Sequence, residues 1–170
     1  MSNSNKSNDQ QMENFNLLVV DDEKEMCESI ELLLNDSFKN LNLSFAYNGQ
    51  DALELIKKQK FLLVITDLNM PMMNGIRMIE NISSLPREQH PNHILVLSGY
   101  LEETEYQGLI KKVNYMSKPF PPNHLINFIQ RMFDKYNKQK DELNGQTSAM
   151  SDEEKILIDG LEKMLTSKIS

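Results

Sequence analysis

The sequence FLLVITDLNMPMMNG, residues 61–75, is the strongest indication of the fold of this chain. It begins with a short apolar run, Leu62 to Ile65, that is rich in β-branched residues. Such a run is typical of a strand buried on both faces, as in the middle of a parallel sheet. Pro71 and Gly75 interrupt any regular continuation, so Asp67 is expected at the carboxyl end of the strand. Ligands of open α/β sheets bind at that edge, although a single aspartate there is more often a cap or turn residue.

Length, composition and charge limit the class of protein. The 170 residues suffice for one domain with additional segments, and the net charge of -7 argues against a nucleic-acid-binding surface. The single cysteine, Cys27, excludes an intramolecular disulfide and a multi-cysteine zinc site, and its helical spacing beside Met26 and Ile30 favours a packed core residue. No secretory signal and no run of about 18 apolar residues is visible, so we expect a cytoplasmic protein without a membrane partner.

Apolar runs alternate with helical patterns along the middle of the chain. The expected strands cover residues 15–20, 43–47, 62–65, 93–97 and 113–116. The expected helices cover residues 23–38, a segment around 52–56, a segment after Gly75, residues 102–111 and a segment from Pro121 onward. The fourth of these helices is polar and should be the most mobile element. Five repeats of strand and helix predict an α/β fold, with a parallel sheet covered by helices on both faces.

The two ends of the chain differ in composition from the middle. Residues 1–14 are polar and should be disordered, and residues 15–143 should form the main domain. Residues 144–151 are expected to be a turn-prone linker, and residues 152–170 an amphipathic helix. That helix would be marginal alone, so it should pack on the main domain, form a homodimer or dock on a partner. Nothing after residue 143 is long enough for a DNA-binding output domain, so we expect no DNA partner.

Polar side chains directly follow four of the apolar runs. Asp21 and Asp22 follow the first run, Asp67 the third, Ser98 the fourth and Lys118 the fifth. Because parallel strands share one edge for their carboxyl ends, we expect these side chains to lie close together.

The residue types at this edge predict their chemistry. Three neighbouring carboxylates repel one another unless a cation neutralises them. Carboxylate oxygens are hard ligands, so Mg²⁺ is the expected cofactor, completed by water and a backbone carbonyl. A magnesium ion, a lysine and a hydroxyl beside an aspartate suit phosphoryl transfer, because the cations offset charge on the phosphoryl oxygens. The aspartate can itself be the nucleophile and form an aspartyl phosphate.

The chain closely resembles the receiver domain of two-component response regulators, the single-domain chemotaxis regulators among them. The resemblance covers about residues 15–136 and rests on LLVVDDE (17–23), YNGQDAL (47–53), VITDLNMPMMNG (64–75), ILVLSG (94–99) and YMSKPF (115–120). It implies a flavodoxin-like, doubly wound sheet of five parallel strands in the order 2-1-3-4-5.

The resemblance also implies how the acidic residues act. Asp67 would accept the phosphoryl group and contribute to the metal site. Asp22 would bind Mg²⁺ directly, and Asp21 largely through water. The backbone carbonyl of Asn69 would be a further ligand.

Other residues would respond to the phosphoryl group. Lys118 would pair with its oxygens or with Asp67, Ser98 would move toward it, and Tyr115 would swing inward behind Ser98. The alternatives are a simple turn residue at Ser98 and a fixed core residue at Tyr115. Gly99 would leave room for the phosphodonor, and the peptide bond before Pro119 would be cis.

The sequence departs modestly from the family pattern around the expected site. Met72 occupies a position where glycine is frequent. Tyr100, two residues beyond Ser98, is bulky and would flank the phosphoryl group together with Asn69. We hypothesise that Tyr100 hinders an attacking water and prolongs the phosphorylated state, which faster dephosphorylation of a Tyr100→Ala protein would support.

The expected function is a stand-alone phosphorylation switch that catalyses only its own phosphorylation and dephosphorylation. A histidine kinase or a histidine phosphotransfer protein would supply the phosphoryl group. A downstream protein would bind the face formed by the fourth helix, fifth strand and fifth helix, or the C-terminal helix. A phosphorelay intermediate is equally compatible with the sequence.

Two other classes remain as alternatives. An aspartate-nucleophile phosphatase of the haloacid dehalogenase type would need an acidic residue two positions after the nucleophile, where this chain has Asn69. A phosphate-independent interaction module would have a degenerate site, whereas every active-site residue type is present here. Its partner binding would be insensitive to Asp67→Ala.

Overall fold

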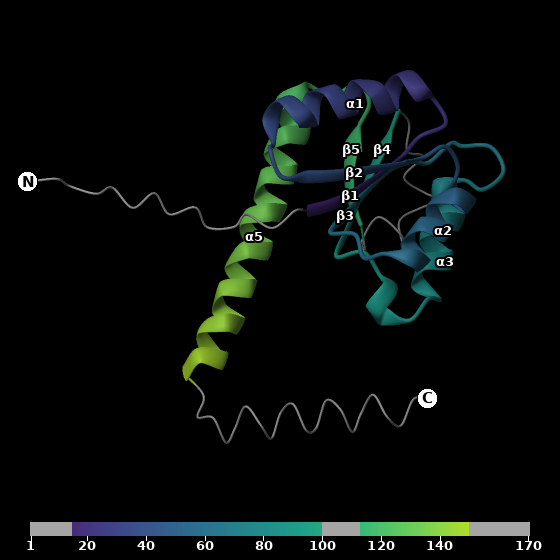
Figure 1. Ribbon diagram of the computed structural model, residues 1–170. Helices are drawn as coiled ribbons and strands as arrows, with labels where there is room; N and C mark the ends of the chain where they lie inside the picture. The colour runs from purple at the N-terminus through teal and green to yellow at the C-terminus, as the bar shows by residue number, and fades with distance from the viewer. Residues whose placement is uncertain (1–14, 100–112, 150–170) are drawn as a thin grey trace, which may run out of the picture. The chain divides into compact units, whose positions relative to one another are not determined.

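The computed structural model describes residues 15–99 and 113–149 of the chain. Strands and helices alternate from residue 15 to residue 98, as Figure 1 shows. The elements are β1 (Phe15–Val20), α1 (Lys24–Ser37), β2 (Leu41–Ala46), α2 (Gly49–Lys58), β3 (Leu63–Asp67), α3 (Gly75–Ser83), the 3-10 turn η1 (Arg87–Gln89), β4 (His93–Ser98), β5 (Asn114–Ser117) and α5 (Pro122–Ala149). The predicted tail 1–14 and the predicted helices 102–111 and 152–170 lie outside the described residues.

The strands form one five-stranded sheet in the order β2-β1-β3-β4-β5. Every neighbouring pair is parallel, and the central pair aligns Val20 with Thr66. The predicted fold class and strand order are therefore confirmed. Each predicted strand begins and ends within two residues of the observed strand, which is the usual uncertainty of such boundaries.

The sheet is buried on both faces, as the apolar runs predicted. Figure 1 shows α1 on one side of the sheet and α2 beside α3 on the other. Alternate strand residues divide between these layers, because successive side chains of a strand point to opposite faces. The layer under α2 and α3 contains Leu18, Val20, Val64 and Val96 from the sheet, with Ala52, Ile56, Met78, Ile79 and Ile82 from the two helices.

Helix α1 contributes a smaller set of buried residues, namely Cys27, Ile30 and Leu34. Cys27 is only 3% exposed, which confirms that it is a packed core residue.

The chain divides into two compact units, Met1–Pro122 and Asn123–Ser170, and nearly all of α5 belongs to the second. The buried side chains of α5 follow helical spacing, as expected for an amphipathic helix: Leu125, Phe128, Ile129 and Phe133. The turn expected at the start of the 144–151 linker is wrong, because the backbone of α5 stays helical through Ala149. A glycine at position 145 weakens a helix by about 1 kcal/mol but does not end one that is already nucleated by the preceding turns. The division into domains 15–143, 144–151 and 152–170 remains a prediction.

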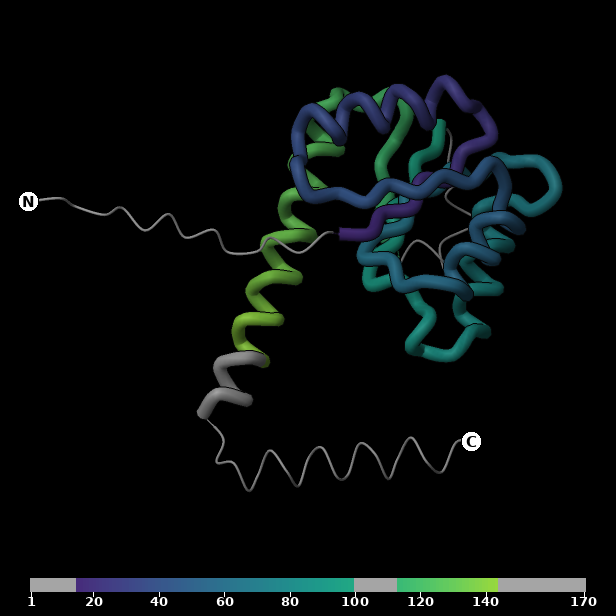
Figure 2. The backbone as a smooth tube through the Cα atoms, in the orientation of Figure 1, coloured from purple at the N-terminus to yellow at the C-terminus, as the bar shows by residue number. Residues whose placement is uncertain are grey.

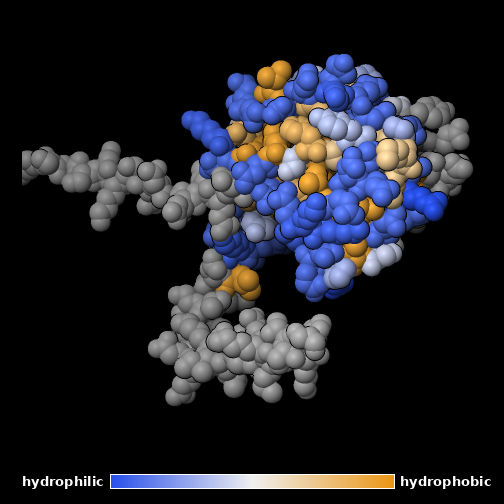
Figure 3. All heavy atoms as spheres, turned by 45° about the vertical axis from the view of Figure 1, so that its right-hand side comes forward, coloured by the Kyte–Doolittle hydropathy of each residue, from blue (hydrophilic) through white to orange (hydrophobic). Residues whose placement is uncertain are grey.

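The surface of the described part is mainly hydrophilic on the face shown in Figure 3, with several separate hydrophobic areas between the hydrophilic residues. None of the helices among residues 15–99 and 113–149 is long and apolar enough to cross a membrane. Two of the large exposed hydrophobic residues, Tyr47 and Met72, lie in the loops that follow β2 and β3. These loops lead to the carboxyl edge of the sheet, where the predicted site lies.

Candidate functional site

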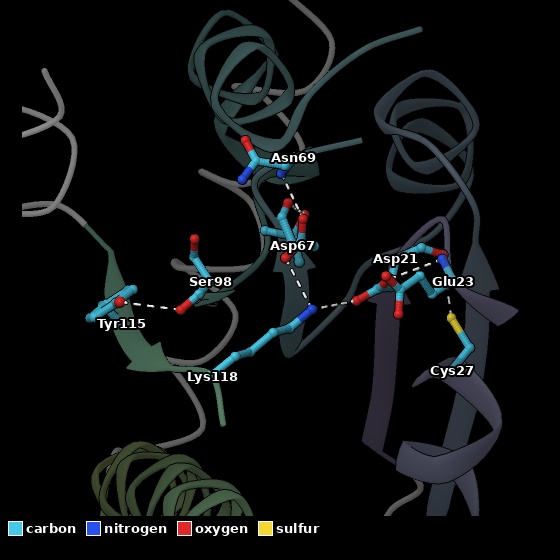
Figure 4. Close-up of polar contacts among 9 residues, drawn as sticks. Asp21, Glu23, Cys27, Asp67, Asn69, Ser98, Tyr115 and Lys118 are labelled. Atoms are coloured by element: carbon cyan, nitrogen blue, oxygen red, sulfur yellow. Dashed lines mark hydrogen bonds and ion pairs between the residues drawn. The ribbon is translucent and has the colours of Figure 1, made fainter. Parts of the chain in front are cut away.

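Five predicted site residues come together at the carboxyl edge of the sheet (Figure 4). Asp21 directly follows β1, Asp67 ends β3, and Ser98 ends β4. Lys118 directly follows β5, and Tyr115 lies within that strand. The parallel arrangement of the strands brings these side chains together although they are far apart in the sequence.

Lys118 lies between the two buried carboxylates. Its Nζ donates to Asp21 Oδ2 at 2.9 Å and to Asp67 Oδ1 at 3.0 Å. Burial lowers the pKa of Lys118, but the hydrogen bonds and negative charges of Asp21 and Asp67 outweigh that effect and raise the pKa above its ordinary value. The ammonium group is therefore charged at neutral pH and fixes the positions of both carboxylates.

The carboxylate of Asp67 is also held by the backbone after it. The amide of Asn69 donates to Asp67 Oδ2 at 2.6 Å. Thr66, fully buried, donates its hydroxyl to the backbone carbonyl of Asp67 at 2.8 Å. Asp67 is only 8% exposed, so a reacting group must approach through a small opening at the sheet edge. A carboxylate oriented in this way is suited to act as a nucleophile.

Asp21 also accepts hydrogen bonds from the first residues around α1. Its Oδ1 accepts a hydrogen bond from the amide of Glu23 at 3.0 Å, which shapes the turn into α1. The thiol of Cys27 donates to the backbone carbonyl of Asp21 at 3.5 Å. Burial, followed by the nearby charge of Asp21, raises the pKa of the Cys27 thiol to about 11. The thiol is therefore protonated at physiological pH, which fits a packed core residue.

Ser98 and Tyr115 are connected through the backbone. Ser98 is fully buried, and its carbonyl oxygen accepts from the amide of Lys118 at 2.8 Å and from the hydroxyl of Tyr115 at 3.3 Å. Tyr115 is 37% exposed, so its ring is not part of the buried core in this structure, and its movement remains a prediction. The peptide bond between Lys118 and Pro119 is cis, as predicted.

Gly99 and Tyr100 were also expected beside the phosphoryl group, and the structure describes only the first of them. Gly99 is exposed, and a Cβ there would have no described atom within 4 Å. Tyr100 lies outside the described residues, so its effect on dephosphorylation remains a hypothesis.

Sequence reasoning missed the residues that shape the loop after β3. The amide of Gly75 donates to the carbonyl of Leu68 at 3.0 Å, and a Cβ at Gly75 would lie 2.2 Å from the carbonyl oxygen of Asp67. The amide of Gly49, the first residue of α2, donates to the carbonyl of Met73 at 3.0 Å. Both glycines occur in the motifs quoted above, but a glycine in a loop indicates only a turn, and the close approaches become visible only in the structure.

The donor atoms at this edge suit Mg²⁺. Asp21 and Asp67 share a single cation, Lys118, so the buried cluster keeps a net negative charge. Asp22, the next residue after Asp21 in the sequence, is exposed, and its predicted place as a metal ligand remains a prediction. Among residues 15–99 and 113–149, no three acidic, histidine or cysteine side chains are close enough to form a complete metal site. Mg²⁺ does not need one, because it binds through one or two carboxylates and keeps several waters.

Comparison with known proteins places this geometry in a family. The family model described as "Response regulator receiver domain" matches residues 17–130. The chain is 32% identical over 123 residues to the chemotaxis protein CheY-3 of Vibrio cholerae, covering 72% of this chain and 94% of CheY-3. It is 32% identical over 124 residues to the regulatory protein VanR of Enterococcus faecium, covering 72% of this chain and 51% of VanR. The chain thus spans less than two thirds of the first curated relatives that it matches.

Solved structures agree with this assignment. The chemotaxis response regulator CheY4 of Vibrio cholerae superposes with a TM-score of 0.60 at 25% sequence identity, covering 70% of this chain and 98% of CheY4. Receiver domains are signalling domains that, as a family, use Mg²⁺ and a phosphorylated aspartate. From its matched residues and its sheet topology, this chain belongs to the response regulator receiver domain family of two-component signalling.

Proposed function

We propose that the chain is a phosphorylation switch in which Asp67 accepts a phosphoryl group from a phosphohistidine. The observation that supports this most strongly is that both carboxylate oxygens of Asp67 accept a hydrogen bond, Oδ1 from Lys118 Nζ at 3.0 Å and Oδ2 from the amide of Asn69 at 2.6 Å. One carboxylate oxygen is held by a cation and the other by the first turn of the loop. This arrangement orients the carboxylate for reaction.

The proposed reaction transfers one group between two partners. An oxygen of Asp67 attacks phosphorus, the phosphorus–nitrogen bond of the phosphohistidine breaks, and its electron pair returns to the imidazole, which takes up a proton. Lys118 offsets the charge on the phosphoryl oxygens as it does on the free carboxylate. Asp21, Asp22, Asp67 and the carbonyl of Asn69 would hold Mg²⁺, which supplies further positive charge against those oxygens.

Ser98 and Tyr115 are the proposed responsive pair. The carbonyl of Ser98 accepts a hydrogen bond from the hydroxyl of Tyr115, and the side chain of Tyr115 is partly exposed to solvent. New acceptor oxygens on Asp67 would attract the Ser98 hydroxyl, and Tyr115 would follow into the space that Ser98 vacates. A Tyr115→Ala protein should still be phosphorylated but should lose the change in partner binding.

The donor would be a histidine kinase or a histidine phosphotransfer protein, the kinds of partner that the family uses. The receiving partner would contact the predicted helix 102–111, β5 or α5, or the predicted C-terminal helix. If the phosphoryl group moves on to a second histidine, the chain would be a relay intermediate. A radiolabel that leaves Asp67 for a histidine phosphotransfer protein would separate this case from a terminal switch.

The test of the central proposal is intact mass after incubation with acetyl phosphate and Mg²⁺. Wild type should gain a single phosphoryl adduct, and EDTA should prevent it. Asp67→Asn should gain none, whereas Asp36→Asn, which changes an exposed aspartate on α1, should behave as wild type. A folded wild-type protein that binds Mg²⁺ and gains no adduct would contradict the proposal and favour a phosphate-independent interaction module.

A further inference from the structure

Helix α2 begins directly against the loop that follows Asp67. The amide of Gly49, the first residue of α2, donates to the carbonyl of Met73 at 3.0 Å. Met73 lies in the loop between β3 and α3, which also contains Asn69. Figure 2 shows this loop passing beside the start of α2. The loop therefore has a fixed contact outside its own segment of chain.

The start of α2 is itself well fixed. Asn48 is 7% exposed, and its Oδ1 accepts from the amides of Gln50 and Asp51, at 2.9 Å each. Its Nδ2 donates to Asp51 Oδ2 at 2.8 Å. The amides of Gln50 and Asp51 are thus satisfied within the cap, whereas the amide of Gly49 points out of the helix to Met73.

The contact leaves no room for a side chain on Gly49. A Cβ there would lie 2.7 Å from the carbonyl oxygen of Met73, 2.9 Å from Met73 Cγ and 3.1 Å from Met78 Cβ. The first of these atoms belongs to the backbone, so a rotamer change of Met73 would not remove the overlap. Gly75, at the other end of the loop, also has no room for a side chain, since a Cβ there would lie 2.2 Å from the carbonyl oxygen of Asp67.

We infer that Gly49 is a positioning residue for the phosphoryl-transfer site: it fixes the loop that holds the carboxylate of Asp67 and the carbonyl of Asn69. The inference rests on the proposed function, and it goes further by assigning part of the geometry of the site to α2. Asn69 provides the connection, because its amide binds Asp67 Oδ2 and its carbonyl is a proposed metal ligand. A displacement at Met73 passes along the few residues between them.

The test is a Gly49→Ala protein, for which two effects predict opposite results. Alanine is the better helix former, so helix propensity alone predicts an unchanged site in a protein that is at least as stable as wild type. The close approach to Met73 instead predicts a displaced loop. We expect the Mg²⁺ dissociation constant, measured by titration calorimetry, to rise about threefold or more, and the rate of phosphorylation by acetyl phosphate to fall about tenfold or more.

Ala52→Gly is the matched control, because it changes the same helix without pressing on the loop. Ala52 is fully buried in α2, and glycine there should lower the midpoint of urea unfolding. Its Mg²⁺ affinity and phosphorylation rate should nevertheless remain those of wild type. Equal losses in Ala52→Gly would overturn the inference, since any loosening of α2 would then suffice. Wild-type values for both quantities in a folded Gly49→Ala protein would overturn it as well.

Two further arrangements keep the outcome interpretable. If Gly49→Ala does not fold, Asn48→Ala weakens the same contact by releasing the cap, and wild-type Mg²⁺ affinity in that protein would contradict the inference. If wild type is not phosphorylated by acetyl phosphate, the proposed function fails. The Mg²⁺ affinity of the variants still tests the positioning role in that case, because it does not depend on phosphorylation.

Discussion

The Nζ of Lys118 lies 3.0 Å from Oδ1 of Asp67, although 51 residues separate the two in the sequence. Lys118 directly follows β5, so this contact connects β5 with the end of β3, and the same ammonium group donates to Asp21 Oδ2 at 2.9 Å. A single positive charge thus faces two buried carboxylates. Lys118 and a bound cation would therefore act on the same oxygen atoms, and the consequences can be measured.

We predict that Lys118→Gln separates metal binding from phosphorylation. Without the ammonium group, Asp21 and Asp67 should bind Mg²⁺ about fivefold more tightly or better, since a competing charge interaction of about 1 kcal/mol or more is removed. The phosphorylation rate should fall about 100-fold, because charge on the phosphoryl oxygens is no longer offset. Titration calorimetry and intact mass measure the two effects.

Lys57→Gln is the control for the loss of a lysine, since Lys57 lies on α2 and pairs with the exposed Glu54 of the same helix. It should leave both quantities unchanged. Weaker Mg²⁺ binding in Lys118→Gln would show that the lysine organises the carboxylates and does not compete for them.

Cys27 should make the stability of the protein sensitive to alkaline pH. Its pKa is about 11 in the folded protein and 9.0 ordinarily, so between these values the unfolded chain loses the thiol proton and the folded chain keeps it bound. The stabilisation is complete below pH 9.0 and is lost as pH rises to about 11, by about 2–3 kcal/mol at most.

Urea unfolding in EDTA, at pH values from 8 to about 11, measures this loss against a Cys27→Ala protein. Lysine and tyrosine residues also titrate in this range, but they do so in both proteins, so the difference between the two curves isolates the thiol. Superimposable pH dependences would contradict the prediction. Because the chain has one cysteine, thiol alkylation reports the same site directly and should be slow until the protein unfolds.

The sequence predicted the sheet and the residues at its carboxyl edge, for a clear physical reason. Buried parallel strands are continuous apolar runs, and Asp67, Ser98 and Lys118 follow such runs directly, so their meeting at one edge follows from the topology. The fold and family assignment are confirmed, whereas the roles of the individual residues remain predictions.

The contact between α2 and the loop after β3 could not be predicted in the same way. Gly49 begins α2 and Met73 lies in that loop, and no periodicity of the sequence indicates that the amide of Gly49 binds the carbonyl of Met73. The turn predicted at the start of the 144–151 segment was wrong for a different reason. Its Asn-Gly pair is a local turn signal, but the preceding helix continues through it as far as Ala149. Local propensity was thus informative where packing agreed with it and misleading where longer-range structure prevailed.

Met72 occupies a strained turn beside the site. Its φ is 64°, the only positive φ of a non-glycine residue in the described part of the chain, and the amide of Met73 donates to the carbonyl of Pro71 at 2.8 Å. A hydrogen bond between residues two apart, with positive φ between them, is the rare and strained form of the three-residue turn. The side chain of Met72 is 82% exposed, so it gains little from packing in return.

We predict that Met72→Gly raises the free energy of unfolding by about 0.5–1 kcal/mol, because relief of the left-handed conformation exceeds the entropy that glycine adds to the unfolded chain. The control is Asn92→Gly, at an exposed loop position where φ is not positive, so that only the entropic cost applies and stability should fall. Urea unfolding measures both changes. The main-chain contacts at Gly49 and Gly75 do not involve the Met72 side chain, so Mg²⁺ affinity and phosphorylation by acetyl phosphate should stay at wild-type values in Met72→Gly. A stabilised protein with a slower phosphorylation rate would instead show that the strain in this turn contributes to the geometry around Asp67.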